Sequence, residues 1–246
     1  MCSIAGGFIN TSVKDNKRNL SGLLHLLLNA ALAKGGDYTS IIFFDKEIKK
    51  CMFKAGLYSD KKEEIERFNN FIISSVNETE LGQLPFLIFS RLTPEMEEST
   101  PEIFQPYKTI AGKYVTAHGT IPLGNNFSGI IDTEIFRFDM GIDKSIEKVQ
   151  TLNGKISLIE YDPEKRVFNS IHNGLGIWLF KNDFIEMVTN VNFIDAFYLP
   201  PMIYHVADLG SEFNLSSSMF TEYDKVDSKY RASGYIKPDV IISLCS

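Results

Sequence analysis

The chain has 246 residues, which is enough for one large domain or two small ones with a sizeable hydrophobic core. Hydrophobic residues make up 44% of the chain and charged residues 23%, as in ordinary globular proteins. The net charge of −6 and the lack of any block of lysine and arginine argue against a nucleic-acid-binding surface.

No segment is expected to cross a membrane, because the longest apolar stretch, residues 23–33, is short and contains His25 and Asn29. The amino terminus lacks the basic and apolar regions of a signal peptide. Three cysteines make no disulfide framework, and an odd number suits a reducing compartment. We therefore expect a cytoplasmic protein.

The chain starts with a glycine-rich apolar segment, in which residues 4–9 predict a buried strand. Cys2 follows the initiator methionine and is small enough to permit removal of Met1. Cys2 would then carry a thiol and an unblocked α-amine, whose pKa of about 7.7–8.0 allows it to accept the thiol proton near neutral pH. The alternative is an incidental early cysteine.

Helices are predicted in two parts of the chain. Ser21 is a candidate cap for a helix over residues 22–34, in which apolar side chains recur at i, i+3, i+4 and i+7. Residues 61–76 predict a second amphipathic helix. Residues 132–138 and 142–151 predict shorter helical segments.

Strands are predicted between and after these helices. Their expected ranges are 4–9, 40–44, 51–54, 84–90, 113–118, 155–161, 167–171, 177–180, 184–188 and 239–244. Helices in two clusters, separated by strand-rich stretches, indicate a layered α+β fold with sheet packed on sheet and helices outside. A single domain over residues 1–246 is the simplest organisation, and most of the tail from residue 191 onward gives no clear pattern.

Several short segments carry a further pattern when they are taken in order. They are Met1-Cys2-Ser3-Ile4, Gly35-Gly36-Asp37, Ser90-Arg91-Leu92-Thr93, Gln105-Pro106-Tyr107, Ala117-His118-Gly119, Asp132-Thr133-Glu134 and Leu152-Asn153-Gly154-Lys155. In this order and spacing they resemble the class II glutamine amidotransferase domain, and most of all the glutaminase domain of asparagine synthetase. The resemblance spans about residues 1–190.

The resemblance implies a four-layer αββα sandwich of the N-terminal-nucleophile type. It also implies hydrolysis of L-glutamine to glutamate and ammonia, through a thiolate at Cys2 and a glutamyl-thioester intermediate. No cofactor is expected, and no spacing of histidine, cysteine or carboxylate residues indicates a metal site.

The resemblance assigns roles to five further residues. Arg91 is expected on the substrate α-carboxylate, with Thr93 beside it in the substrate-binding segment, and Asp132 on the α-ammonium group. Gly119 and His118 are expected to form the oxyanion hole, although the family has an asparagine where His118 stands. The alternatives are a surface arginine at 91, a helix cap at 132 and a structural histidine at 118.

The remaining histidines receive no catalytic role. His172, with Asn173 and Gly174, follows a predicted strand and is interpreted as part of a hairpin turn. His25 lies beside the apolar stripe of its helix and is interpreted as structural, and His205 is unplaced.

Three functions stay open at this point. The first is a glutaminase subunit that supplies ammonia to a separate synthetase or ATP-pyrophosphatase-type ligase. The second is an N-terminal-nucleophile amidohydrolase acting on another amide. The third is a non-catalytic regulatory or assembly subunit, which the histidine at 118 and the arginines missing from two motifs would suit. The sequence leaves the oligomeric state open.

Overall fold

The computed structural model describes residues 2–33, 38–53, 62–91, 105–120, 155–172 and 177–191, with short strands at 220–221, 234–236 and 242–245. The elements in chain order are β1 (Ser3–Asn10), the 3-10 helix η1 (Thr11–Asp15), α1 (Lys17–Leu32), β2 (Tyr38–Phe44), β3 (Ile48–Phe53), α2 (Lys62–Glu78), β4 (Gln83–Arg91), β5 (Tyr107–Lys108), β6 (Tyr114–Thr120), β7 (Lys155–Asp162), β8 (Val167–His172), β9 (Ile177–Lys181), β10 (Ile185–Thr189), β11 (Phe220–Thr221), β12 (Gly234–Ile236) and β13 (Ile242–Cys245).

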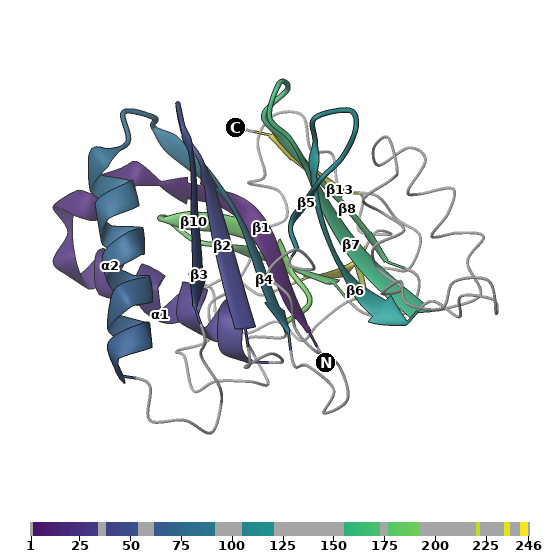
Figure 1. The fold of residues 1–246 in the computed structure, drawn as a ribbon, viewed down its shortest axis with the longest axis horizontal. Coiled ribbons are helices and arrows are strands. Elements are labelled where there is room, and N and C mark those ends of the chain that lie inside the picture. The colour runs from purple at the N-terminus through teal and green to yellow at the C-terminus, as the bar shows by residue number, and fades with distance from the viewer. Residues whose placement is uncertain are drawn as a thin grey trace.

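The strands form two stacked sheets (Figure 1). The first sheet has the order β11-β12-β9-β10-β1-β4-β2-β3, and the second has the order β13-β8-β7-β6-β5. Every pairing within them is antiparallel. The first strand of the chain, β1, therefore lies inside the larger sheet, between β10 and β4.

The two helices α1 and α2 cover the outer face of the first sheet (Figure 1). The apolar stripe of α1 is buried as the sequence predicts, and Leu23 and Leu27 have no exposed surface. The predicted cap at Ser21 was wrong, because α1 begins at Lys17. The side chain of Asn16 accepts hydrogen bonds from the N–H groups of Arg18 and Asn19, and it caps the helix five residues earlier than Ser21 would.

A second core fills the space between the two sheets. Phe44 of β2 packs on Tyr161 of β7 with ring centroids 4.4 Å apart and the rings tilted by 39°, and Phe8 of β1 meets Phe168 of β8 edge-on at 5.0 Å. The sheets are also close at Gly6, where an added Cβ would lie 3.0 Å from Ile159 Cγ2 of β7 and 3.2 Å from Phe168 Cδ1 of β8. This close approach lets the amino-terminal strand pack directly on the second sheet.

The predicted α+β class with two packed antiparallel sheets is confirmed. Within the described residues, helices lie on the first sheet, and the predicted helical segments 132–138 and 142–151 fall outside the described part of the chain. The third predicted strand was set too late, since β3 begins at Ile48. None of the described helices has the length and apolar character needed to cross a membrane.

Candidate functional site

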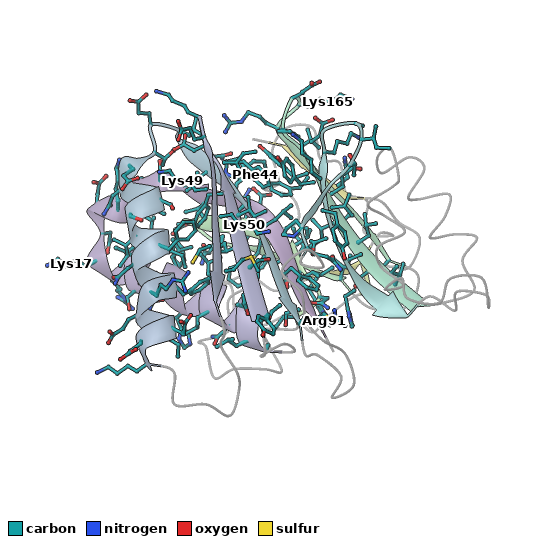
Figure 2. All side chains as sticks on the ribbon, viewed as in Figure 1. Lys17, Phe44, Lys49, Lys50, Arg91 and Lys165 are labelled. Atoms are coloured by element: carbon teal, nitrogen blue, oxygen red, sulfur yellow. The ribbon has the colours of Figure 1, made fainter. Side chains whose placement is uncertain are left out.

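Three neighbouring strands of the first sheet, β1, β4 and β2, bring predicted site residues to one end of the sheet. In the register of β1, β4 and β2, Ser3 lies opposite Ser90, and Ser90 lies opposite Thr39. One step further out, Arg91 lies opposite Tyr38, and Cys2 directly precedes Ser3. Cys2 and Arg91 are thus neighbours at the end of this sheet, and Figure 2 shows Arg91 at the end where β1 begins in Figure 1.

The side chains of Cys2 and Arg91 belong to the face that meets the second sheet. Successive side chains of a strand point to opposite faces, and Ile4 of β1 and Phe89 of β4 both lie in the core between the sheets. Cys2 and Arg91 share this alternation with them. The thiol-bearing side chain of Cys2 is half-buried and packs against the same core.

The second sheet brings His118 to its inner face. Tyr114 of β6 lies in the core between the sheets, so the alternation turns His118 toward the first sheet and Gly119 away from it. His118 pairs with Ser157 of β7, whose hydroxyl donates to the His118 carbonyl at 3.4 Å. Both His118 and Gly119 are half-buried.

His118, Ser157 and His172 form a row across β6, β7 and β8, and the sequence had placed His172 in a turn. Ser157 pairs with His172, which is the last residue of β8 and is fully buried. The interpretation of His172 as part of a hairpin turn was therefore wrong. Asn173 and Gly174 lie outside the described residues.

The core contacts show at which end of the sandwich this row lies. Along β7, Tyr161 stacks on Phe168, which in turn meets Phe8, and Ile159 lies close to Gly6. Moving two residues further along each strand, in the same direction, leads to Ser157 on β7 and toward Cys2 on β1. The row of His118 and Ser157 thus belongs to the end of the sandwich at which Cys2 and Arg91 lie.

Gln105 ties the two sheets together next to this row. Its side-chain oxygen accepts hydrogen bonds from the Ala117 N–H at 2.5 Å and from the Thr116 hydroxyl at 3.2 Å. Its backbone carbonyl accepts from the Ser40 hydroxyl of β2 at 2.5 Å. The motif around Gln105 was noticed in the sequence, but nothing there indicated that it would connect β2 to the residue before His118.

Asn190, just after β10, also reaches this end of the sandwich and was missed from the sequence. Its side chain bonds the backbone of Cys2 and Ile4. A single asparagine outside any motif carries no sequence signal for such a role. Thr93 and Asp132, which were predicted to bind substrate, lie outside the described residues.

A second cysteine in the described residues offers a comparison with Cys2. Cys51 is only 6% exposed and belongs to the core between the first sheet and the helices. Burial raises the pKa of the Cys51 thiol, which disfavours the nucleophilic thiolate. Neither cysteine is in a disulfide. Among these two thiols, Cys2 has the exposure that a nucleophile needs.

A buried ion pair lies on the other face of the second sheet and is separate from this site. Glu160 is fully buried, and Lys113 Nζ lies 3.0 Å from its Oε1 atom and 3.8 Å from Asp162 Oδ2. Burial raises the pKa of Glu160, and the nearby ammonium of Lys113 opposes that shift. Glu160 pairs with Val115, so it belongs to the face of the sheet opposite His118.

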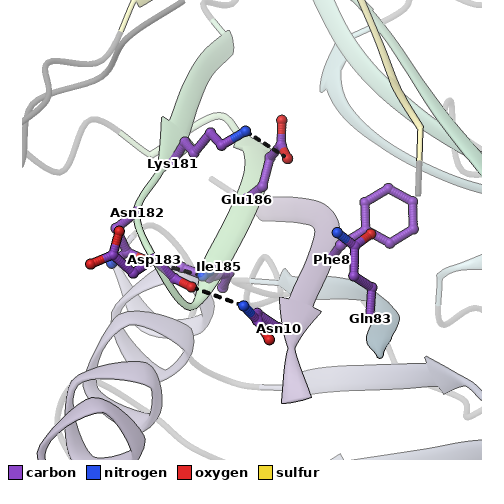
Figure 3. A pocket seen from close by; sticks show the side chains of 8 residues that line it. All are labelled: Phe8, Asn10, Gln83, Lys181, Asn182, Asp183, Ile185 and Glu186. Carbon is purple, nitrogen blue, oxygen red and sulfur yellow. Dashed lines mark hydrogen bonds and ion pairs between the residues drawn. The ribbon is translucent and has the colours of Figure 1, made fainter. Parts of the chain in front are cut away.

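A cavity of about 270 Å³ opens at the opposite end of β1 from Cys2 (Figure 3). It is formed around the β9–β10 hairpin, where Lys181 and Glu186 form an ion pair of 3.5 Å and the Asn10 side chain donates to the Asp183 carbonyl. Its lining residues are Phe8, Asn10, Gln83, Lys181, Asn182, Asp183, Ile185 and Glu186. None of them is a predicted site residue. Among the described residues, no group of three or more histidine, cysteine or carboxylate side chains is arranged to hold a metal ion.

Comparisons with known proteins give a similarity of structure only. No protein-family model matches the chain, and no curated protein matches it. One similar solved structure is glutamine phosphoribosylpyrophosphate amidotransferase from B. subtilis, complexed with ADP and GMP, with 13% identity and a TM-score of 0.46. Another is the allosteric regulatory enzyme of purine biosynthesis, with 14% identity and a TM-score of 0.45. Each alignment covers 77% of this chain and 42% of the solved chain, so this chain spans less than half the length of either protein.

Proposed function

We propose that the chain is a glutaminase of the class II glutamine amidotransferase type, which hydrolyses L-glutamine to glutamate and ammonia. The observation that supports this most is that the strands next to or containing Cys2, Arg91 and His118 reach the same end of the sandwich, with the three residues on the facing sides of the two sheets. The order of the motifs along the chain had suggested the same three residues independently of any geometry.

Cys2 would act as nucleophile and carry its own base once Met1 is removed. The α-amine accepts the thiol proton, and the thiolate attacks the carboxamide carbon of glutamine. The carbon–nitrogen bond then breaks, and the α-ammonium returns the proton to the departing ammonia. Water hydrolyses the resulting thioester to glutamate, and the thiol regains its proton.

Charged and polar groups around Cys2 would select glutamine and stabilise the oxyanion. The planar guanidinium of Arg91 suits a two-pronged hydrogen-bonded pair with the substrate α-carboxylate, and Thr93 and Asp132 are proposed on the sequence motifs alone. The His118 imidazole N–H and the backbone N–H of Gly119 would donate to the oxyanion. The ammonia would serve an acceptor synthetase or ATP-pyrophosphatase-type ligase.

Ammonia release from glutamine, measured with a coupled assay, tests the nucleophile. Intact-mass spectrometry first establishes that Met1 is absent from the sample. We expect Cys2→Ala to abolish ammonia release without loss of the folded state, because it removes the attacking atom. Cys51→Ala, which removes the thiol in the other core, is the matched control and should retain release. Unchanged release in Cys2→Ala would refute the assignment.

Steady-state kinetics with glutamine test the carboxylate-binding role. Hydrogen bonds to charged groups contribute about 1.5–3 kcal/mol each, so Arg91→Ala should raise KM by about tenfold or more. The exposed Arg18 on α1 supplies a control of equal charge, and Arg18→Ala should leave KM unchanged. A KM for Arg91→Ala within about twofold of wild type would count against the role.

The histidine at position 118 supports a second candidate function. Removing one oxyanion donor typically lowers turnover by about 10²–10³, and His118 stands where the family has an asparagine. If Met1-free wild-type protein releases no ammonia from glutamine or from other amides, the chain is better described as a non-catalytic regulatory or assembly subunit. Release from other amides but not from glutamine would indicate a different amidohydrolase.

A further inference from the structure

The first residue after β10 closes the chain back onto its own beginning. Asn190 has no exposed surface, and its backbone N–H donates to the Ile4 carbonyl at 3.1 Å. Its side-chain oxygen accepts from the Ile4 N–H at 2.9 Å, and its side-chain nitrogen donates to the Cys2 carbonyl at 2.9 Å. Both ends of one amide side chain are therefore bonded to the backbone of the amino-terminal segment.

The neighbouring residue holds Asn190 in the position from which it reaches Cys2. The Thr189 hydroxyl donates to the Ile4 carbonyl at 2.8 Å and accepts from the Val191 N–H at 3.1 Å. Thr189 is itself fully buried and is the last residue of β10 to pair with β1, opposite Ala5. The backbone around Asn190 is therefore held by hydrogen bonds both to Ile4 of β1 and within residues 189–191.

Cys2 needs such a contact more than any other residue of the segment. It lies just before β1, and the register of β1 and β4 begins with the pair of Ser3 and Ser90. Terminal residues are poorly ordered unless they are tied down. The bond from Asn190 to the Cys2 carbonyl holds the peptide plane that follows Cys2, and so limits where the Cα that carries the amine and the thiol can lie.

We propose that Asn190 is the positioning residue of the amino-terminal nucleophile. It acts through Cys2 and is not expected to touch the substrate. By holding the peptide plane after Cys2, it keeps the Cys2 side chain packed on the core between the sheets, and this packing restricts the rotamer that places the thiol beside its amine. The kinetic part of this proposal rests on the proposed glutaminase function, whereas the effect on the Cys2 thiol can be measured without any substrate.

Two variants remove the contact in different ways. Asn190→Leu is neutral and loses both side-chain bonds, whereas Asn190→Asp still accepts from Ile4 but cannot donate to Cys2 while it is ionised. Thr39→Val is the matched control: it deletes a buried hydrogen bond of 2.7 Å to Ser90 in the same sheet. By strand alternation, that bond lies on the helix-covered face, away from the Cys2 thiol.

The substrate-independent measurement is the alkylation rate of Cys2 by iodoacetamide across a range of pH, followed by peptide mass spectrometry on Met1-free protein. A rise of one unit in the pKa of the Cys2 thiol lowers the fraction of thiolate near pH 7 about tenfold. With a shift of that size, iodoacetamide should alkylate Cys2 about tenfold more slowly in Asn190→Leu and Asn190→Asp than in wild type. Thr39→Val should alkylate at the wild-type rate. Thermal unfolding of all variants confirms that the folded state is being compared.

Glutamine kinetics provide the second measurement. A misplaced nucleophile typically costs up to about 100-fold in rate, so the Asn190 variants should lower kcat by about 10- to 100-fold, with KM within about twofold of wild type. If wild type releases no ammonia, the glutaminase proposal fails and alkylation alone decides the role of Asn190. Equal alkylation rates in Asn190→Leu and Thr39→Val would overturn the inference. Slow alkylation in Asn190→Asp alone would also overturn it, because the added negative charge would then explain the change.

Discussion

Gln105 offers a direct test of how the two sheets are held together beside the candidate site. It is 2% exposed, and its side-chain oxygen accepts from the Ala117 N–H and the Thr116 hydroxyl of β6. The variant Gln105→Met keeps the length of the side chain but removes this oxygen. The bond from Ser40 to the Gln105 carbonyl does not depend on the side chain and remains available.

The cost follows from the two donors that lose their acceptor. Ala117 and Thr116 are both buried, and leaving a buried donor unsatisfied costs about 1–3 kcal/mol. The Thr116 hydroxyl can rotate toward another acceptor, whereas the backbone N–H of Ala117 cannot. We therefore expect Gln105→Met to lower the free energy of unfolding by about 2 kcal/mol, mostly through Ala117. For a chain of this size the melting temperature should fall by about 4–8 °C.

Urea denaturation of wild type, Gln105→Met, Thr116→Val and the double variant measures this cost. Thr116→Val removes the weaker donor and should cost less than Gln105→Met. The double-variant cycle should give a coupling energy between the two positions of about 0.5 kcal/mol or more. If Gln105→Met unfolds within about 0.5 kcal/mol of wild type, Gln105 does not hold the sheets together in the way described.

Two further predictions concern packing and pH. In urea denaturation, Gly7→Ala should lower the free energy of unfolding by more than the about 1–3 kcal/mol that is usual for overpacking, because its Cβ would lie 2.0 Å from the backbone oxygen of Glu186. The control is Gly82→Ala, whose added Cβ meets nothing within 4 Å and should leave the stability unchanged. Equal stability of these two variants would contradict the close pairing of β1 with β10. Burial raises the pKa of Tyr161 from 10.0 to about 12, so the folded protein holds this proton more tightly than the unfolded chain, and stability present below pH 10 is lost as the pH rises toward 12. Tyr161→Phe should lack this loss, and a difference from wild type that stays constant from about pH 10 to 12 would refute it.

Much of the fold could be predicted because its signals are local. The spacing of Leu23 and Leu27 identifies the buried face of α1 without any knowledge of the sheet beneath it. The start of α1 was misjudged, because the polar residues before it hide the capping role of Asn16. Short strands such as β12, which joins the first sheet beside β9, depend on a distant partner and left little trace in the tail.

The candidate site could be predicted in part. Residue order and type indicated Cys2, Arg91 and His118, and the structure brings the strands that carry them to one end of the sandwich. Gln105 was noticed as a motif but without its role, and Asn190 was missed. The roles of Thr93 and Asp132 stay predictions, since these residues lie outside the described part of the chain.

The sequence by itself determined the chemistry that the amino terminus offers and the alternation of its strands, because residue type and short-range periodicity do not depend on distant partners. Only the tertiary structure decided what holds that terminus in place. Asn190 and Cys2 are 188 residues apart, and their contact exists because β10 pairs with β1 in a particular register. A shift of that register by one residue would turn every side chain of the strand to the other face, and no local pattern near Asn190 reports it.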